Sequence, residues 1–262
     1  MRRPGREVAQ VVDYSTGRPA YQQVADALRG RILDGSLAPG DMLPSERAIM
    51  DEFDVSRTVP RMAIKVLSTE GLIDTHQGKG AFVRRPVQLR RLSSDRYRRG
   101  HPGDSPFSRD VPAEGRRPTW DYRVARARAS ARVADRLGIA EGDGVVVARY
   151  TFMDGTQPLQ RSTSYEPAAI VAGTPIEDPE SGPITGDVIA RMDSIGRRIT
   201  SVVEDVSARA PSPGEVTDLR IKPGIPVLVV ARTMYADDTP LEYCDILIPA
   251  DRSLLSYRVG VE

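Results

Sequence analysis

Cysteine and histidine are scarce in this sequence of 262 residues, which contains only Cys244, His76 and His101 of these two types. A single cysteine excludes a disulfide within the chain and any Cys-x-x-Cys motif. Two histidines far apart in sequence argue against a histidine-rich metal site. We therefore expect no metal and no cofactor, and we expect Cys244 to be a small packed side chain.

Long hydrophobic runs are also missing. No stretch reaches the roughly 18 apolar residues that a membrane span requires, and no apolar run follows the charged N-terminus MRRPGREVAQ. With 40% hydrophobic and 28% charged residues, the composition is that of a soluble protein of about two domains. These features predict a cytoplasmic protein with no membrane partner.

Common enzyme motifs are absent as well. The sequence has no P-loop, no dinucleotide-binding glycine fingerprint and no Gly-x-Ser-x-Gly nucleophile elbow. We therefore expect no catalytic residues and no enzymatic activity.

Charge is divided unevenly along the chain. Residues 1–118 contain 21 Lys and Arg against 15 Asp and Glu, a net charge of +6, whereas the remainder has a net charge of −5. This asymmetry indicates a front half that binds a polyanion, joined to a half that does not, although a chance imbalance of solvated charge would look the same.

The basic half begins with two predicted helices. Apolar residues four apart predict a helix over residues 20–34, which Gly35 ends. A turn-rich stretch follows, and Ser45 is placed to cap a second helix over residues 46–53.

A third helix is predicted in the stretch DVSRTVPRMAIKVL, from Asp54 to Leu67. Arg57, Arg61 and Lys65 recur at intervals of four, which places three cations on one exposed face. We expect Ser56 to cap this helix.

Pro60 interrupts this pattern. With Ser56 as the cap, Pro60 occupies the fourth helical position and loses one hydrogen bond to the Ser56 carbonyl. A proline also disfavours helical angles at Val59, so we expect a loosened first turn.

The sequence LIDTHQGKGAFV then predicts a β-hairpin. Three helices followed by a hairpin are the pattern of a winged helix-turn-helix, whose third helix enters the major groove of DNA. The segment from about residue 14 to residue 85 resembles the DNA-binding domain of the GntR family of bacterial transcription regulators.

This resemblance identifies Arg47, Arg57 and Arg61 as DNA-contacting arginines. An arginine can pair with both O6 and N7 of guanine. The complete set of expected DNA-binding residues is Ser45, Arg47, Ser56, Arg57, Thr58, Arg61, Lys65 and, at the tip of the wing, His76, Gln77, Gly78 and Lys79. For the serines, helix capping alone would explain the residue type.

Residues 86–118 are rich in Arg, Pro, Gly and Ser and predict an exposed linker with one short strand near Val87–Leu92. From residue 119 the pattern changes to alternating strands that contain an internal repeat. Residues 147–167, VARYTFMDGTQPLQRSTSYEP, align with residues 230–249, VARTMYADDTPLEYCDILIP. Each copy predicts a hairpin, and ASARVADRLG and GDVIARMDSIGRRI predict helices beside them.

Residues 119–262 resemble the UTRA domain, the ligand-sensing domain of the HutC branch of the GntR family, whose fold is similar to chorismate lyase. The resemblance implies an α+β fold with an antiparallel sheet, a dimer interface and an effector pocket containing Arg149, Thr151, Ser164, Tyr165 and Glu242. Thr151 and Ile248 depart from the residues of relatives that bind sugar phosphates. For each pocket candidate, pairing within the sheet is an equally good interpretation.

We therefore expect a homodimeric, ligand-responsive transcription regulator, a repressor that binds a pseudo-palindromic operator of double-stranded DNA. Two alternatives stay open at this point. One is a lyase-type enzyme fused to a DNA-binding head, and the other is a DNA-binding dimer without a ligand.

Overall fold

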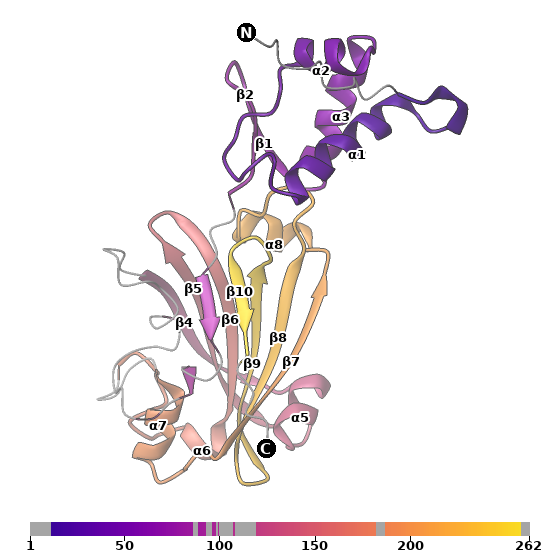
Figure 1. Cartoon of the computed structure of the whole chain (residues 1–262). Helices are drawn as coiled ribbons and strands as arrows, with labels where there is room; N and C mark the ends of the chain where they lie inside the picture. The colour runs from indigo at the N-terminus through magenta and orange to yellow at the C-terminus, as the bar shows by residue number, and fades with distance from the viewer. Residues whose placement is uncertain are drawn as a thin grey trace, which may run out of the picture. The chain divides into compact units, whose positions relative to one another are not determined.

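The structure is a computed structural model that describes residues 12–85, 89–92, 96–97, 99, 107, 119–181 and 187–257. The chain divides into two units, Met1–Pro86 with Lys222–Ile225, and Val87–Ile221 with Pro226–Glu262 (Figure 1). One unit is mainly helical and the other is built on an antiparallel sheet, which confirms the predicted α+β class. No helix of the described residues is long and apolar enough to cross a membrane.

The first unit contains three helices and a hairpin, as predicted. Its elements are η1 (Tyr14–Thr16), α1 (Ala20–Leu33), α2 (Glu46–Phe53), α3 (Thr58–Thr69), β1 (Ile73–His76) and β2 (Gly80–Val83). Each of α1, α2, α3 and β1 contributes at least one fully buried side chain to the shared core, such as Leu28, Ile49, Leu67 and Ile73. Burial of these apolar side chains is the main stabilising contribution to a small domain.

The turn between α2 and α3 is sharp. Asp54 ends α2 in the left-handed conformation, with φ of 51°, which Asp adopts more readily than most residues. Ser45 caps α2 as predicted, because its side chain accepts a hydrogen bond of 3.1 Å from the Ala48 N–H.

The predicted cap of α3 is wrong. Helix α3 begins at Thr58 with Arg57 as its N-cap, and no side chain caps it. The Ser56 hydroxyl instead lies 3.2 Å from the Thr58 hydroxyl.

Because α3 begins at Thr58, Pro60 is its third helical residue. The Ser56 carbonyl accepts a hydrogen bond of 3.0 Å from the Val59 N–H. Because a third-position N–H has no intrahelical partner, Pro60 removes no hydrogen bond.

The second unit is built on a six-stranded antiparallel sheet in the order β4-β5-β6-β9-β8-β7. Its strands are β4 (Thr119–Arg128), β5 (Gly144–Asp154), β6 (Gln157–Pro167), β7 (Ser201–Arg209), β8 (Val227–Ala236) and β9 (Thr239–Pro249). The two hairpins, β5-β6 and β8-β9, are the two copies of the sequence repeat, and they join where Thr163 pairs with Asp245. The repeat therefore forms the centre of the sheet.

A β-bulge occurs at the same position in both hairpins. Phe152 pairs with Gln160 and Met153 with Pro158, so Leu159 has no partner in the ladder. In the second hairpin, Leu241 likewise has no partner in the ladder. Both leucines are only 1% exposed, so the repeat preserves a bulge that turns a leucine into the core.

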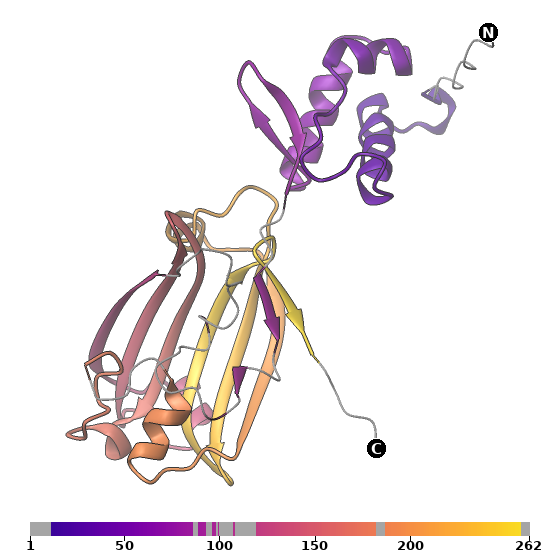
Figure 2. The same ribbon diagram turned by 60° about the vertical axis from the view of Figure 1, so that its left-hand side comes forward.

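Short helices cover parts of both faces of this sheet (Figures 1 and 2). They are α5 (Ala131–Leu137), α6 (Ala168–Val171) and α7 (Val188–Ser194), whereas α8 (Pro213–Asp218) lies at the end of the strands. Helix α5 packs with Val145 and Val147 of β5, whereas α6 and α7 pack with Val146. Successive strand residues point to opposite faces, so this alternation assigns α5 to one face and α6 and α7 to the other.

Most of the predicted linker, residues 86–118, lies outside the described residues. Within it, β3 (Leu89–Leu92) is the predicted strand and pairs in parallel with β10 (Ser253–Ser256). The expectation of exposed arginines was wrong for Arg91 and Arg96, which are each 3% exposed. Arg91 pairs with Glu204 of β7, a partner too distant in sequence to be foreseen.

Candidate functional sites

Helix α3 presents cations on one face and buries the other. The Arg57, Arg61 and Lys65 side chains are exposed, whereas Ala63 and Leu67 are fully buried. The four-residue spacing produces this separation, because it keeps the three cations on the side away from the core. Thr58 is also exposed at the start of the helix.

Helix α2 adds polar groups beside this face. The Arg47 side chain is 91% exposed, and its Nε lies 3.9 Å from the Asp51 carboxylate. An exposed ion pair of this length restrains the side chain only weakly. The Arg61 Nε donates a 2.9 Å hydrogen bond to Glu46. This bond connects α3 to the first turn of α2 and orients the Arg61 guanidinium.

The hairpin tip is a short exposed turn. His76 pairs with Gly80 across the hairpin, and the Lys79 N–H donates to the His76 carbonyl at 3.0 Å. Gly78 adopts φ of 74°, a left-handed conformation that favours glycine. Gln77 and Lys79 are exposed at this tip, as the sequence predicted for the wing.

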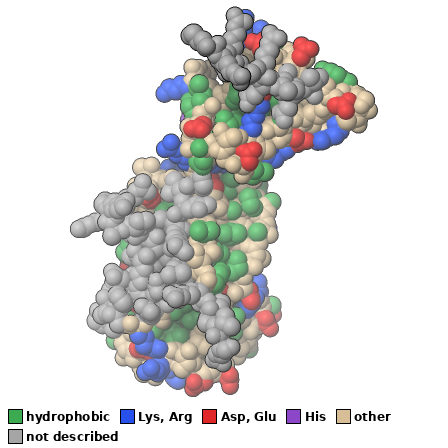
Figure 3. Space-filling view, in the orientation of Figure 1, with side chains coloured by type: hydrophobic (Ala, Val, Ile, Leu, Met, Phe, Trp, Pro, Cys, Tyr) green, Lys and Arg blue, Asp and Glu red, His purple; other side chains and the backbone are tan. Residues whose placement is uncertain are grey.

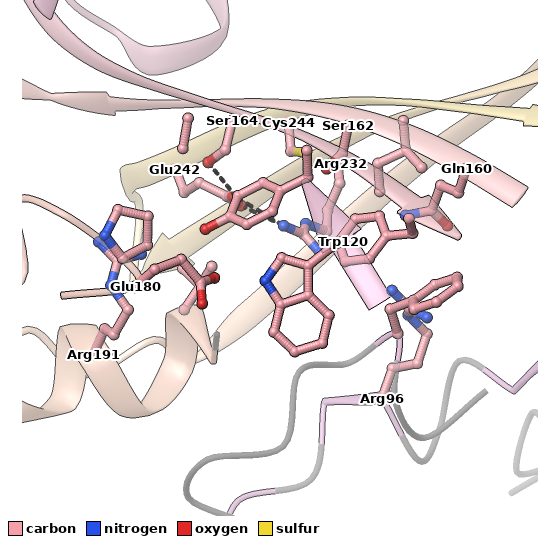
Figure 4. Close-up of a pocket in the computed structure, with 17 residues that line it drawn as sticks. Arg96, Trp120, Gln160, Ser162, Ser164, Glu180, Arg191, Arg232, Glu242 and Cys244 are labelled. Atoms are coloured by element: carbon pink, nitrogen blue, oxygen red, sulfur yellow. Dashed lines mark hydrogen bonds and ion pairs between the residues drawn. The ribbon is translucent and has the colours of Figure 1, made fainter. Parts of the chain in front are cut away.

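A cavity lies on the face of the second unit's sheet that α7 covers (Figure 4). The strands contribute alternate residues to it, such as Ala148, Tyr150 and Phe152 of β5. Its polar and charged lining residues are Arg96, Gln160, Ser162, Ser164, Glu180, Arg191, Arg232 and Glu242.

A buried ion pair occupies one wall of the cavity. The Arg232 Nη2 donates to both carboxylate oxygens of Glu242, at 2.7 and 3.0 Å, and the Ser164 hydroxyl donates to the same carboxylate at 2.7 Å. Arg232 is 6% exposed and Glu242 is fully buried. Burial disfavours the charged guanidinium, but Glu242 outweighs this effect and raises the pKa of Arg232.

A second buried ion pair connects α7 to β6. Both Nη atoms of Arg191 donate to the Glu166 carboxylate at 3.0 Å, and Nη2 also contacts the Ile176 carbonyl. Burial raises the pKa of Glu166 although Arg191 opposes the shift. Because breaking a buried pair leaves an uncompensated charge, both pairs should fix the shape of the cavity.

Two of the five predicted effector-binding residues, Ser164 and Glu242, line this cavity. Arg149, Thr151 and Tyr165 do not, because they point to the opposite face of the sheet. Tyr165 stacks on Tyr243 there, with ring centroids 6.0 Å apart, in the cluster that packs with α5.

The sequence did not single out Trp120, Tyr150, Arg191 or Arg232 of the lining. The alternation of side chains along a β-strand would have identified some of these lining residues. Ser164 pairs with Ala148, so the even-numbered residues of β5 share its face and Arg149 cannot. Arg191 carried no local signal, because its position depends on how α7 packs on the sheet.

Cys244 lies beside the ion pair and is 2% exposed, as predicted for a packed residue. Burial raises the pKa of its thiol to about 12. The thiol is therefore protonated at neutral pH and is a poor nucleophile. The described residues contain no cluster of His, Cys, Asp or Glu that could hold a metal ion.

Comparison with known proteins finds two family models along the chain. Residues 20–83 match the gntR family of bacterial regulatory proteins, and residues 113–253 match the UTRA domain. An uncharacterized HTH-type transcriptional regulator of Streptomyces coelicolor is 35% identical over 251 residues, covering 93% of each chain. The HTH-type transcriptional repressor NagR of Bacillus subtilis is 28% identical over 238 residues, covering 89% of this chain and 92% of NagR. A crystal structure of a GntR-family transcriptional regulator is 39% identical, with a TM-score of 0.70, and covers 94% of this chain and 99% of that chain.

Proposed function

Because the chain belongs to the GntR family of bacterial regulatory proteins and carries a UTRA domain, we propose that it is a ligand-responsive repressor that binds operator DNA as a homodimer. We assign residues 14–85 to DNA binding, 86–118 to a linker, and 119–262 to effector binding and dimerisation. The relatives are named as transcriptional regulators, and NagR as a repressor, which favours regulation over catalysis.

The observation that carries the DNA-binding role is the exposed cationic face of α3. Arg57, Arg61 and Lys65 follow a sharp turn and stand opposite a buried apolar face. In this role, Arg61 and Arg57 read base edges in the major groove, while Lys65 neutralises a phosphate. Arg47 on α2 adds a further contact.

Phosphate contacts complete this interface in the proposal. Ser45, Ser56 and Thr58 lie at the starts of α2 and α3, where hydroxyls and backbone N–H groups suit phosphate oxygens. The tip residues His76, Gln77, Gly78 and Lys79 form the wing, and Lys79 supplies its charge.

Dimerisation is assigned to the second unit. Hydrophobic side chains gather on the surface of this unit (Figure 3). Among the described residues, Val203 and Val206 of the edge strand β7 are 46% and 43% exposed. An edge strand with exposed valines is suited to contact a second copy of the chain.

The cavity lined by Ser164 and Glu242 is the proposed effector site. A ligand can change operator affinity only if it binds one arrangement of the dimer better than another. We keep Arg149, Thr151 and Tyr165 as candidates for a contact on the opposite face, with the cavity as the primary site.

DNase footprinting with the purified full-length protein tests this function. We expect a protected site with two-fold symmetry, whose occupancy falls steeply as salt rises. A single asymmetric site that is insensitive to salt would contradict the proposal. A library screen for metabolites that raise the melting temperature, followed by the same footprint, tests the effector role.

A further inference from the structure

One apolar side chain lies among the polar and charged residues on the exposed face of α3. Met62 is 46% exposed. The other exposed residues of this helix, which the structure describes from Thr58 to Thr69, are Thr58, Arg61, Lys65 and Thr69. A solitary exposed apolar residue is common on protein surfaces. The position of Met62 therefore decides whether it has a role.

Met62 lies between residues that face DNA in the proposed interface. It follows Thr58 by four positions and precedes Lys65 by three, and residues at these spacings share one face of a helix. Thr58 and Lys65 contact phosphates in that interface. A side chain placed between them on the same face points into the same groove.

Met62 and Arg61 reach different parts of this groove. Successive helical residues point about 100° apart around the helix axis. The Arg61 Nε bonds to Glu46 of α2 at 2.9 Å, which holds the guanidinium on the side of α2. Met62 carries no such restraint from its neighbour's bond, because its side chain leaves the helix in another direction.

The chemistry of methionine selects among the base edges. Its thioether sulfur is at most a weak acceptor, and the side chain has no donor. In the major groove, the C5 methyl of thymine is the apolar group, whereas the other bases present hydrogen-bond donors and acceptors. A methionine pressed against such a polar edge would remove its water without replacing the hydrogen bond, which costs free energy.

We propose that Met62 is a specificity-determining residue that contacts the C5 methyl group of one thymine in each operator half-site. A helix rises about 1.5 Å per residue and base pairs are about 3.4 Å apart, so this thymine lies within about two base pairs of the guanine read by Arg61. The inference rests on the proposed operator binding and adds one base to what α3 recognises.

Replacement of single methyl groups in the DNA tests this contact. An operator is first selected from random duplexes with the purified full-length protein, and each thymine is then replaced in turn by deoxyuridine, which lacks only the methyl group. Fluorescence anisotropy at fixed salt measures the affinity. At one thymine in each half-site, the replacement should weaken binding about fourfold, the value expected for one lost methyl contact.

Two variants assign the effect to its residue. Met62→Gln keeps the length of the side chain but makes it polar, so this variant should bind the thymine and deoxyuridine duplexes equally. The matched control is Leu33→Gln, because Leu33 is 73% exposed at the end of α1. This control should keep the full preference for thymine. Melting temperatures of both variants establish that each is folded.

The outcomes separate this inference from the proposed function. Equal binding of all the deoxyuridine duplexes by the wild type would overturn the role of Met62. An unchanged thymine preference in Met62→Gln would overturn it as well, and so would a selected half-site without thymine. In each of these cases a selected site with two-fold symmetry leaves operator binding intact, whereas a selection that enriches no sequence rejects the proposed function itself.

Discussion

Arg61 is held differently from the other cations of α3. Its Nε bonds to Glu46 on α2 at 2.9 Å, while its side chain is still 57% exposed. This partial restraint lowers the conformational entropy that the side chain loses when it binds a base. We therefore regard Arg61 as the principal candidate for base recognition.

Arg61→Ala should weaken operator binding by about 10- to 100-fold, because a bidentate arginine–guanine contact contributes about 1 to 3 kcal/mol. Fluorescence anisotropy at fixed salt measures the change. The matched control is Arg29→Ala on α1, whose guanidinium is paired with Glu70 at the end of α3. An equal loss of affinity in both variants would show that Arg61 contributes charge and no specific contact.

Pro60 should stabilise the first unit. Its ring is buried at the third position of α3, and no backbone hydrogen bond is lost there. Pro60→Ala is therefore expected to lower the free energy of unfolding by about 1 kcal/mol, because the unfolded chain gains freedom and apolar burial is lost. Urea denaturation measures this change, with Met62→Ala, an exposed residue of the same helix, as the control. A Pro60→Ala variant that is more stable than the wild type would contradict this prediction and would indicate that Pro60 loosens the first turn of α3.

At the scale of elements, α8 depends on a capping box. The Ser212 hydroxyl accepts from the Glu215 N–H, and the Glu215 carboxylate accepts from the Ser212 N–H. Arg209 donates two further bonds of 2.7 Å to Glu215. The bonds from Arg209 are the largest cause that lowers the pKa of Glu215, to about 2, against an ordinary value of 4.5.

This lowered pKa makes the second unit less stable in acid. A carboxylate with a depressed folded-state pKa contributes stability above its unfolded pKa and loses it as pH falls. Between pH 6 and 3.5, we expect Glu215 to account for a loss of about 1 kcal/mol in unfolding free energy, allowing for the exposure of Arg209. Urea denaturation of wild type and Glu215→Gln should show this difference. Parallel pH profiles of the two proteins would contradict the assignment.

The elements of both units follow local sequence signals closely, whereas the cavity does so only in part. Helix α2 and the hairpins have strong caps, turns and alternation, so the sequence predicts them. Ser56 failed as a cap because the backbone at Arg57 is already helical. The contribution of Arg96 and Arg191 to the cavity depends on packing between segments distant in sequence, which periodicity does not reveal.

At the scale of the whole molecule, the repeat gives the second unit two hairpins with the same pairing pattern but different side chains on each face. Arg149 and Arg232 occupy matching places in the two copies, yet Arg232 is buried in the cavity wall and Arg149 is exposed on the opposite face. The two matching strand positions therefore place one arginine in a buried ion pair with Glu242 and the other on the exposed face of the sheet.

Recognition of a specific operator by a symmetric dimer can be measured on the DNA of a whole genome. Sequencing the genomic DNA that the purified protein retains, at near-physiological salt, tests it most directly. We expect one enriched motif with two-fold symmetry. Retained DNA with no enriched motif, or with a motif that lacks two-fold symmetry, would contradict it.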